Sequence, residues 1–202
     1  VDLESGRLVS IKEDSEVYTL QGGARRSIYY YRDTSWLEWD EDNVSVVPGP
    51  IPGDTILDRL YFTGAGYSSN NSDYPRVGTA ASLVSGSSGY PVNSYRLGIP
   101  APTSALTAVK SGTADDTQTP SDVSYVWTYV SAMGEEGPPS PASTVFELTD
   151  AETVVVTMGG TLAGNYNFGS GALRRIYRSN TGSTNTTFQF VGEVDYGTQT
   201  FT

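Results

Sequence analysis

Short apolar segments separated by turn residues recur along the whole chain. In most of them apolar and polar side chains alternate with a period of two, or β-branched and aromatic residues cluster, as is typical of β-strands. No window of about a dozen residues keeps apolar side chains at helical spacing without interruption. The sequence therefore predicts an all-β fold, with strands at residues 7–12, 16–20, 27–31, 36–39, 44–47, 59–63, 104–109, 123–133, 144–148, 153–158, 173–179, 188–194 and 199–201.

Local composition divides the chain into two halves. Residues up to about 76 are rich in aromatic and charged side chains, whereas residues 78–98 are rich in Ser and Gly, which is typical of linkers and exposed loops. Pro100 and Pro102 then impose an extended backbone. We predict a β-rich meander region over residues 1–98 that ends in this linker, and a strand-rich domain over residues 99–202.

Composition narrows the possible functions. The chain of 202 residues contains no Cys and no His, which excludes disulfides, thiolate zinc sites, cysteine nucleophiles and histidine-based catalytic triads. It has 12 Lys and Arg against 23 Asp and Glu, and its formal net charge of −11 repels phosphate backbones and anionic lipids. We therefore expect no specific nucleic-acid binding, no membrane insertion, no cofactor and no metal.

The second half contains a hairpin-like pattern. Residues 125–132 alternate aromatic or apolar with small side chains and lead into the turn and proline sequence GEEGPPSP at 134–141. This pattern resembles the last hairpin of fibronectin type III domains, and residues 173–182 and 188–194 resemble the middle strands of that family. The resemblance implies a β-sandwich. Because the hairpin precedes the middle strands, the sandwich is permuted, shared with a neighbouring segment or merely similar.

The order of motifs along the chain resembles a second group of proteins. Residues 2–8, 36–40, 44–51, 58–64 and 74–77, followed by the hairpin, are similar to tail or neck structural proteins of tailed bacteriophages, some of them nozzle-like with propeller repeats. The resemblance implies a virion component present in several copies, with a propeller-like first half. The chain begins with Val1 rather than Met, and we expect a fragment or a processed chain.

The function that we expect from this resemblance is structural and non-enzymatic. The chain would assemble with copies of itself and with other virion proteins through strand edges and loops, especially residues 64–74 and 159–171, and packaged DNA would pass nearby. The alternative is an adhesion module of a phage tail that binds a receptor or glycan through residues 29–39 and the loop around Asn70. A glycan-cleaving enzyme would need two carboxylates that face each other, and sequence spacing alone does not show this.

Several residues are candidates for contact with other chains. Neighbouring strand residues point to opposite faces, so the Tyr29–Tyr31 run places at least one ring outward. Arginine and tyrosine are enriched at protein interfaces, and dense positive charge is rare on this acidic chain. The candidate interface residues are Tyr29, Tyr30, Tyr31, Arg32, Arg25, Arg26 and Arg174. The alternative for the arginines is an ordinary strand edge whose cations deter aggregation.

Acidic residues cluster after the strand at 36–39. Asp40, Glu41, Asp42 and Asn43 are oxygen-bearing side chains of the kind that calcium prefers. The spacing does not match an EF-hand loop, since the required Gly and Glu are missing. We therefore interpret the cluster as a solvated hairpin tip.

Overall fold

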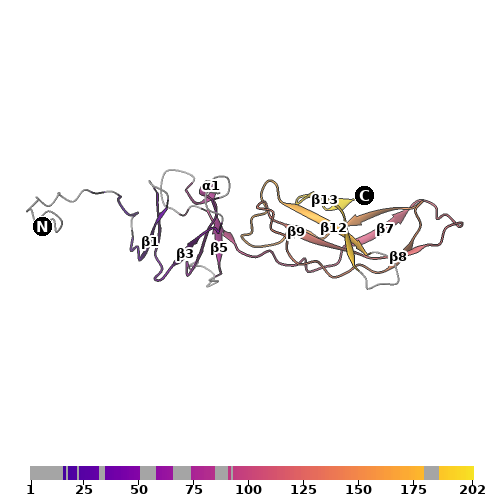
Figure 1. The fold of residues 1–202 in the computed structure, drawn as a ribbon, viewed down its shortest axis with the longest axis horizontal. Coiled ribbons are helices and arrows are strands. Elements are labelled where there is room, and N and C mark those ends of the chain that lie inside the picture. Colours follow the sequence, from indigo (N-terminus) through magenta and orange to yellow (C-terminus); the bar gives the residue numbers. More distant parts are fainter. Residues whose placement is uncertain are drawn as a thin grey trace, which may run out of the picture. The chain divides into compact units, whose positions relative to one another are not determined.

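The structure is a computed structural model of the chain, and it describes residues 16, 18–21, 23–31, 35–50, 58–65, 74–84, 91, 93–179 and 187–202 (Figure 1). Fourteen strands and one four-residue helix lie in these segments. The predicted all-β fold is confirmed. The contacts divide the chain into two compact units, the first formed by Val1–Asp73 and Gly78–Asn93, the second by Tyr74–Val77 and Ser94–Thr202.

The first unit contains two antiparallel strand pairs. β1 (Ser27–Tyr31) pairs with β2 (Ser35–Trp39), and β3 (Ser45–Pro48) pairs with β4 (Leu60–Thr63). Apolar side chains from these strands form one core, because alternate strand residues point to the same face. The buried members of the core are Tyr31, Leu37, Trp39, Leu60, Phe62, Ala65 and Leu83.

Part of the segment that we expected to be a linker is folded. Helix α1 (Ala80–Leu83) begins after Thr79, whose backbone and side chain exchange hydrogen bonds with Ser82 in a capping box. Leu83 is fully buried in the core of the first unit, and a Cβ on Gly78 would collide with its side chain. A glycine is therefore required beside this leucine. Leu83 is therefore an apolar anchor within this Ser/Gly-rich segment.

β5 (Arg76–Gly78) pairs antiparallel with β6 (Tyr95–Arg96) through Arg76 and Val77, which belong to the second unit. Two three-stranded sheets follow. One has the order β13 (Phe188–Asp195), β12 (Leu173–Ser179), β9 (Tyr125–Val130), and the other the order β14 (Thr200–Phe201), β11 (Thr153–Thr157), β7 (Thr107–Ser111). β10 (Phe146–Leu148) pairs separately with β8 (Ser121–Val123).

An extended proline-bearing segment covers the far edge of β9. The backbone N–H groups of Gly137, Ser140 and Ser143 donate to the carbonyl oxygens of alternate β9 residues at 3.0, 2.9 and 2.8 Å. Prolines at 138, 139 and 141 cannot donate hydrogen bonds, so this segment ends the sheet on that side. Among the described residues, β13 is therefore the outer strand of this sheet whose free edge has no strand partner.

Both three-stranded sheets contribute to one hydrophobic core. Trp127 on β9 is 1% exposed, and its ring packs edge to face against Tyr129 with 4.8 Å between ring centroids. Val156 from β11 and Ile176 from β12 are buried in the same cluster. Burial of these side chains stabilises the unit at about 25 cal/mol per Å² of apolar area.

The structure also differs from some predicted elements. The described residues among 16–20 are not in a strand, and the predicted strand at 7–12 lies outside the described residues. β5, β6 and α1 were not predicted, since two- to four-residue elements are too short to show a period. The propeller-like and fibronectin-like details of the fold stay predictions.

Candidate functional site

The tyrosines of β1 have different environments. Tyr30 is 50% exposed, Tyr29 is half-buried, and Tyr31 is 5% exposed with its hydroxyl donating to Asp58 Oδ2 at 2.8 Å. The prediction that at least one ring of this run points outward is confirmed by Tyr30. Ile28, two residues before Tyr30 on the same face, is 54% exposed. β1 therefore offers a small apolar surface.

The arginines predicted at an interface near β1 are paired within the chain where the structure describes them. Arg25 Nε lies 2.9 Å from Glu38 Oε2, and Arg26 Nη1 lies 2.9 Å from Asp42 Oδ2. Arg32 lies outside the described residues. The interface role of Arg25 and Arg26 stays a prediction.

Arg174 is not a surface residue, and its assignment to an interface was wrong. Its side chain is fully buried. The guanidinium donates to the carbonyl oxygens of Gly159, Gly160 at 3.2 Å and Tyr196 at 2.7 Å, and lies over the rings of Trp127, Tyr129 and Tyr196. Burial lowers the pKa of Arg174, but a guanidinium stays charged at any ordinary pH. The residue organises the core of its own unit.

Arg175 is the outward member of the Arg174–Arg175 pair. Its Nη1 lies 2.8 Å from Glu136 Oε2, and its Nε lies 3.0 Å from Glu193 Oε2. Glu136 also accepts hydrogen bonds from Thr128 Oγ1 at 2.7 Å and from the hydroxyl of Tyr177. Partial burial acts to raise the pKa of Glu136, and these hydrogen bonds outweigh it, so its pKa lies below the ordinary value of 4.5.

The loop at 159–171, predicted to contact other subunits, packs on its own unit. The Phe168 ring stacks on Tyr196 with 4.5 Å between ring centroids. The backbone N–H of Leu162 donates to the Tyr196 hydroxyl at 2.7 Å, and the carbonyl of Asn167 accepts from Ala132 N at 2.9 Å. Of the other predicted contact loop, at 64–74, only residues 64, 65 and 74 are described.

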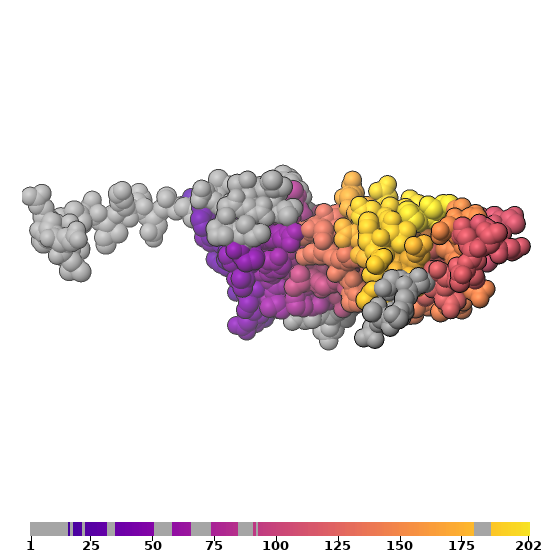
Figure 2. All heavy atoms as spheres, turned by 45° about the vertical axis from the view of Figure 1, so that its right-hand side comes forward, coloured from indigo at the N-terminus to yellow at the C-terminus, as the bar shows by residue number. Residues whose placement is uncertain are grey.

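The most apolar surface of the second unit follows β13. Phe188, Phe190 and Val191 are 39%, 56% and 42% exposed. Because β13 is an outer strand of its sheet, these side chains lie beside backbone N–H and C=O groups that have no strand partner among the described residues. The residues from β13 onward, yellow in Figure 2, form part of the visible surface.

A β-bulge explains why the alternation along β13 did not predict this surface. Inward-facing Ile176 pairs with Gly192, but outward-facing Tyr177 pairs with Phe190, so Val191 is the extra residue of the bulge. Phe190 therefore lies on the outer face, where its ring contacts Tyr177 edge to face with 5.8 Å between ring centroids. Gly192 faces inward, and a Cβ there would lie 2.5 Å from the Phe201 ring. The only signal in the sequence is this glycine inside an apolar strand.

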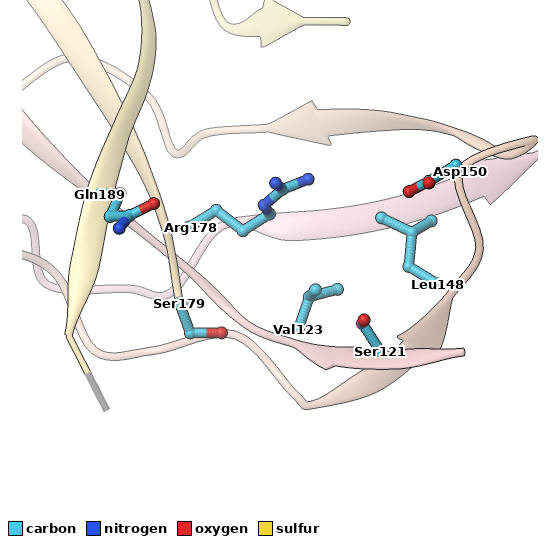
Figure 3. A pocket seen from close by; sticks show the side chains of 7 residues that line it. All are labelled: Ser121, Val123, Leu148, Asp150, Arg178, Ser179 and Gln189. Carbon is cyan, nitrogen blue, oxygen red and sulfur yellow. The ribbon is translucent and has the colours of Figure 1, made fainter. Parts of the chain in front are cut away.

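The second unit also contains a polar pocket of about 430 Å³, which we call the Arg178 pocket (Figure 3). One wall comes from β12 and β13, the other from β8, β10 and the residues that follow β10. The side chains shown in Figure 3 converge on the space between these walls. They belong to Ser121, Val123, Leu148, Asp150, Arg178, Ser179 and Gln189. The sequence does not reveal this pocket, because its walls come together only in the fold.

Metal clusters and membrane-spanning helices are absent from the described segments. Those segments contain no cluster of three or more metal-ligating His, Cys, Asp or Glu side chains. They also contain no helix long and apolar enough to span a membrane. No family model matches this chain, and neither does any curated protein sequence or any solved structure. The function is therefore inferred from the chemistry of the surfaces themselves.

Proposed function

We propose that this chain is a non-enzymatic structural component that assembles with copies of itself through strand edges, as part of a bacteriophage virion. The observation that carries the assembly role is the outer edge of β13, where Phe188, Phe190 and Val191 are all exposed. The sequence resemblance to tail and neck proteins supports the virion assignment. We also propose that the second unit is a fibronectin type III-like sandwich, supported by its two sheets and the proline-bearing segment beside β9.

The chemistry of β13 supports strand addition. An outer strand presents a row of N–H and C=O groups that a strand of another chain can pair with. Proteins protect such edges with short strands, lysines, prolines or β-bulges. β13 is eight residues long and contains neither Lys nor Pro, and its bulge at Val191 leaves Phe188 and Phe190 exposed beside the edge. Exposed aromatic side chains beside the edge add apolar burial when a second chain pairs there.

β7 is a useful contrast on the same unit. It is also an outer strand, and it exposes Val109 at 59%. Next to Val109 lies Lys110, whose ammonium is held by Glu152 Oε1 at 3.0 Å. A lysine at an edge opposes pairing because its charge would be buried against the incoming strand. The two edges therefore offer a matched test and control.

Light scattering after size-exclusion chromatography tests the assembly role. We expect the chain to associate at concentrations up to about 100 µM, and Phe190→Lys to weaken the association at least tenfold, roughly the loss for a buried aromatic anchor. Val109→Lys, the same change on the protected edge, should leave the association unchanged. A chain that stays monomeric, or a Phe190→Lys variant that associates as well as the original, would contradict assembly through β13.

The virion assignment needs a separate test. Antibody against this chain should label purified phage particles from the source of the sequence at one fixed position in electron micrographs. Absence of the chain from those particles by mass spectrometry would contradict the virion assignment and leave the β13 contact to be judged by light scattering.

The adhesion alternative receives no support at the place where the sequence put it. Trp36, one of the aromatic residues of this segment, has its ring centroid 4.8 Å from that of Tyr30 and 6.2 Å from that of Tyr18. Asn70 lies outside the described residues. We therefore do not propose glycan binding through residues 29–39.

A further inference from the structure

We propose that the Arg178 pocket of the second unit binds a saccharide unit that carries a carboxylate group. This inference concerns a different surface from the β13 edge and does not depend on the assembly role. It follows from the donors that the pocket leaves unused, from the placement of opposite charges on its two walls, and from its volume and polarity.

Two hydrogen-bond donors of β12 point into the pocket without an acceptor in the described part of the chain. Arg178 is exposed, and its guanidinium makes no hydrogen bond or ion pair there, although the neighbouring Arg174 and Arg175 are fully engaged. Ser179 is 7% exposed, and its Oγ accepts a hydrogen bond from Ser124 N at 2.9 Å. The hydroxyl hydrogen of Ser179 is still available, and a buried donor without an acceptor is unfavourable. An oxygen-rich ligand would satisfy both groups.

The geometry of a guanidinium favours a carboxylate over a neutral group. The planar fork of Arg178 can donate two parallel hydrogen bonds to the two oxygens of one carboxylate. The opposite wall carries Asp150, whose carboxylate has no hydrogen-bond donor among the described residues. Asp150 repels a doubly charged anion such as phosphate but accepts hydrogen bonds from hydroxyl groups. The ligand therefore combines one negative charge with neutral donors.

The placement of Arg178 and Asp150 on opposite walls of the pocket narrows the class of ligand further. The two side chains face the pocket from opposite walls (Figure 3), and they form no ion pair with each other within the described structure. A sugar acid has its carboxylate at one end of a ring and hydroxyl groups at the other. That arrangement matches the two walls.

The volume and lining of the pocket agree with this ligand. About 430 Å³ lies near the lower end of the range for small-molecule sites, which suits one or two sugar rings. Most such sites are lined by apolar side chains. Here Val123 and Leu148 are the apolar members, and hydroxyl, amide and charged groups make up the rest. A lining of this kind recognises a hydrophilic ligand through hydrogen bonds.

Calorimetric titration of the full chain with glucuronic acid, glucose, acetate and inorganic phosphate tests the proposal. We expect glucuronic acid to bind with a millimolar or lower dissociation constant and each of the other three to bind at least about tenfold more weakly. Glucose lacks the carboxylate, and acetate lacks the hydroxyl groups. Equal binding of glucose, tighter binding of acetate or phosphate, or no binding of glucuronic acid would overturn the proposal.

Three variants test which side chains of the pocket bind glucuronic acid. Arg178→Gln should weaken the binding of glucuronic acid at least about tenfold, the loss expected for a charge-assisted pair. Arg175→Gln removes the same charge from the same strand outside the pocket and should change the affinity less than twofold. Asp150→Asn should weaken glucuronic acid without affecting acetate. If Arg175→Gln and Arg178→Gln weaken binding equally, overall charge explains the result and the pocket assignment is wrong.

Discussion

Each of the two units buries a charged side chain, but the groups that stabilise the buried charge differ between the units. In the first unit Glu38 is 4% exposed and meets an opposite charge, Arg25, at 2.9 Å. Its carboxylate also accepts hydrogen bonds from the Tyr18 hydroxyl at 2.8 Å and from Gln21 N at 3.0 Å. In the second unit Arg174 is fully buried, and in the described part of that unit its partners are carbonyl oxygens and aromatic rings.

A buried guanidinium and a buried carboxylate need different partners inside a β-fold. A guanidinium is weakly hydrated, and its faces and edges have separate uses: the faces stack on rings while the N–H groups donate to carbonyl oxygens. It can therefore be buried without a counterion. A carboxylate has only acceptor oxygens and is more costly to bury unless several donors, one of them charged, surround it. The two sites are open to separate tests.

Replacing Arg174 should give the largest effect. Arg174→Ala leaves three carbonyl oxygens without a donor and opens a cavity beside Trp127, so we expect a loss of about 3–5 kcal/mol in the free energy of unfolding of the second unit. Denaturant unfolding measures the loss. Amide hydrogen exchange should show it in peptides from 94–202 and not in those from the first unit. An unchanged unfolding midpoint would mean that the carbonyl oxygens do not depend on Arg174.

Replacing Glu38 should cost less, because its partner Arg25 can reach water. The side chain of Arg25 is 23% exposed, so Glu38→Ala leaves a partly solvated cation without its carboxylate partner. We expect a loss of about 2–3 kcal/mol in the first unit, measured by denaturant unfolding. Asp42→Asn is the matched control, since the Arg26–Asp42 pair is exposed on both sides and should contribute less than about 1 kcal/mol. Equal losses for the two variants would remove the distinction between buried and exposed pairs.

Lysine substitutions separate the contribution of the positive charge from that of the planar guanidinium at Arg174 and Arg25. Arg174→Lys keeps the charge but loses the planar group that stacks on Trp127 and donates in several directions, so we expect a loss of about 1–3 kcal/mol. Arg25→Lys keeps an ammonium beside Glu38 and should cost less than about 1 kcal/mol. Thermal unfolding of both variants measures the difference. A larger loss for Arg25→Lys would show that geometry matters more at the ion pair than at the aromatic site.

Arg174 also marks the limit of what could be predicted from the sequence. β1 and β12 were predicted with the bounds observed, because residues 27–31 and 173–179 combine alternation with aromatic and β-branched side chains. Alternation also showed that Arg174 and Arg175 face opposite ways, but not which of them faces inward. That choice depends on carbonyl oxygens at 159, 160 and 196, which only the fold brings to the residue.

The candidate surfaces were harder to predict for a similar reason. The face on which Phe190 lies is set by a one-residue bulge, and the Arg178 pocket is formed by strands that are not neighbours in the sequence, β8, β10, β12 and β13. Neither a bulge nor a meeting of distant strands leaves a periodic signal. By contrast, the outward ring in the Tyr29–Tyr31 run was predictable because strand geometry alone requires it.

The smallest expected effect lies on the surface of the second unit, where a carboxylate is held as Glu38 is, by several donors, but close to water. The pKa of Glu136 is below its ordinary value of 4.5 because hydrogen bonds from Thr128, Tyr177 and Arg175 outweigh the effect of partial burial. Folding therefore favours the ionised carboxylate. Its contribution to stability is complete above about pH 4.5 and is lost as the pH falls through the lowered pKa of the folded state.

Glu136→Gln tests this contribution. The variant should be slightly less stable than the original chain near pH 7, and the difference should shrink toward pH 3, where protonation removes the same charge from the original chain. Denaturant midpoints at the two pH values measure it, and Glu135→Gln, at the neighbouring position, is the control. A difference that stays constant with pH would show that the Arg175–Glu136 contact adds shape and not charge.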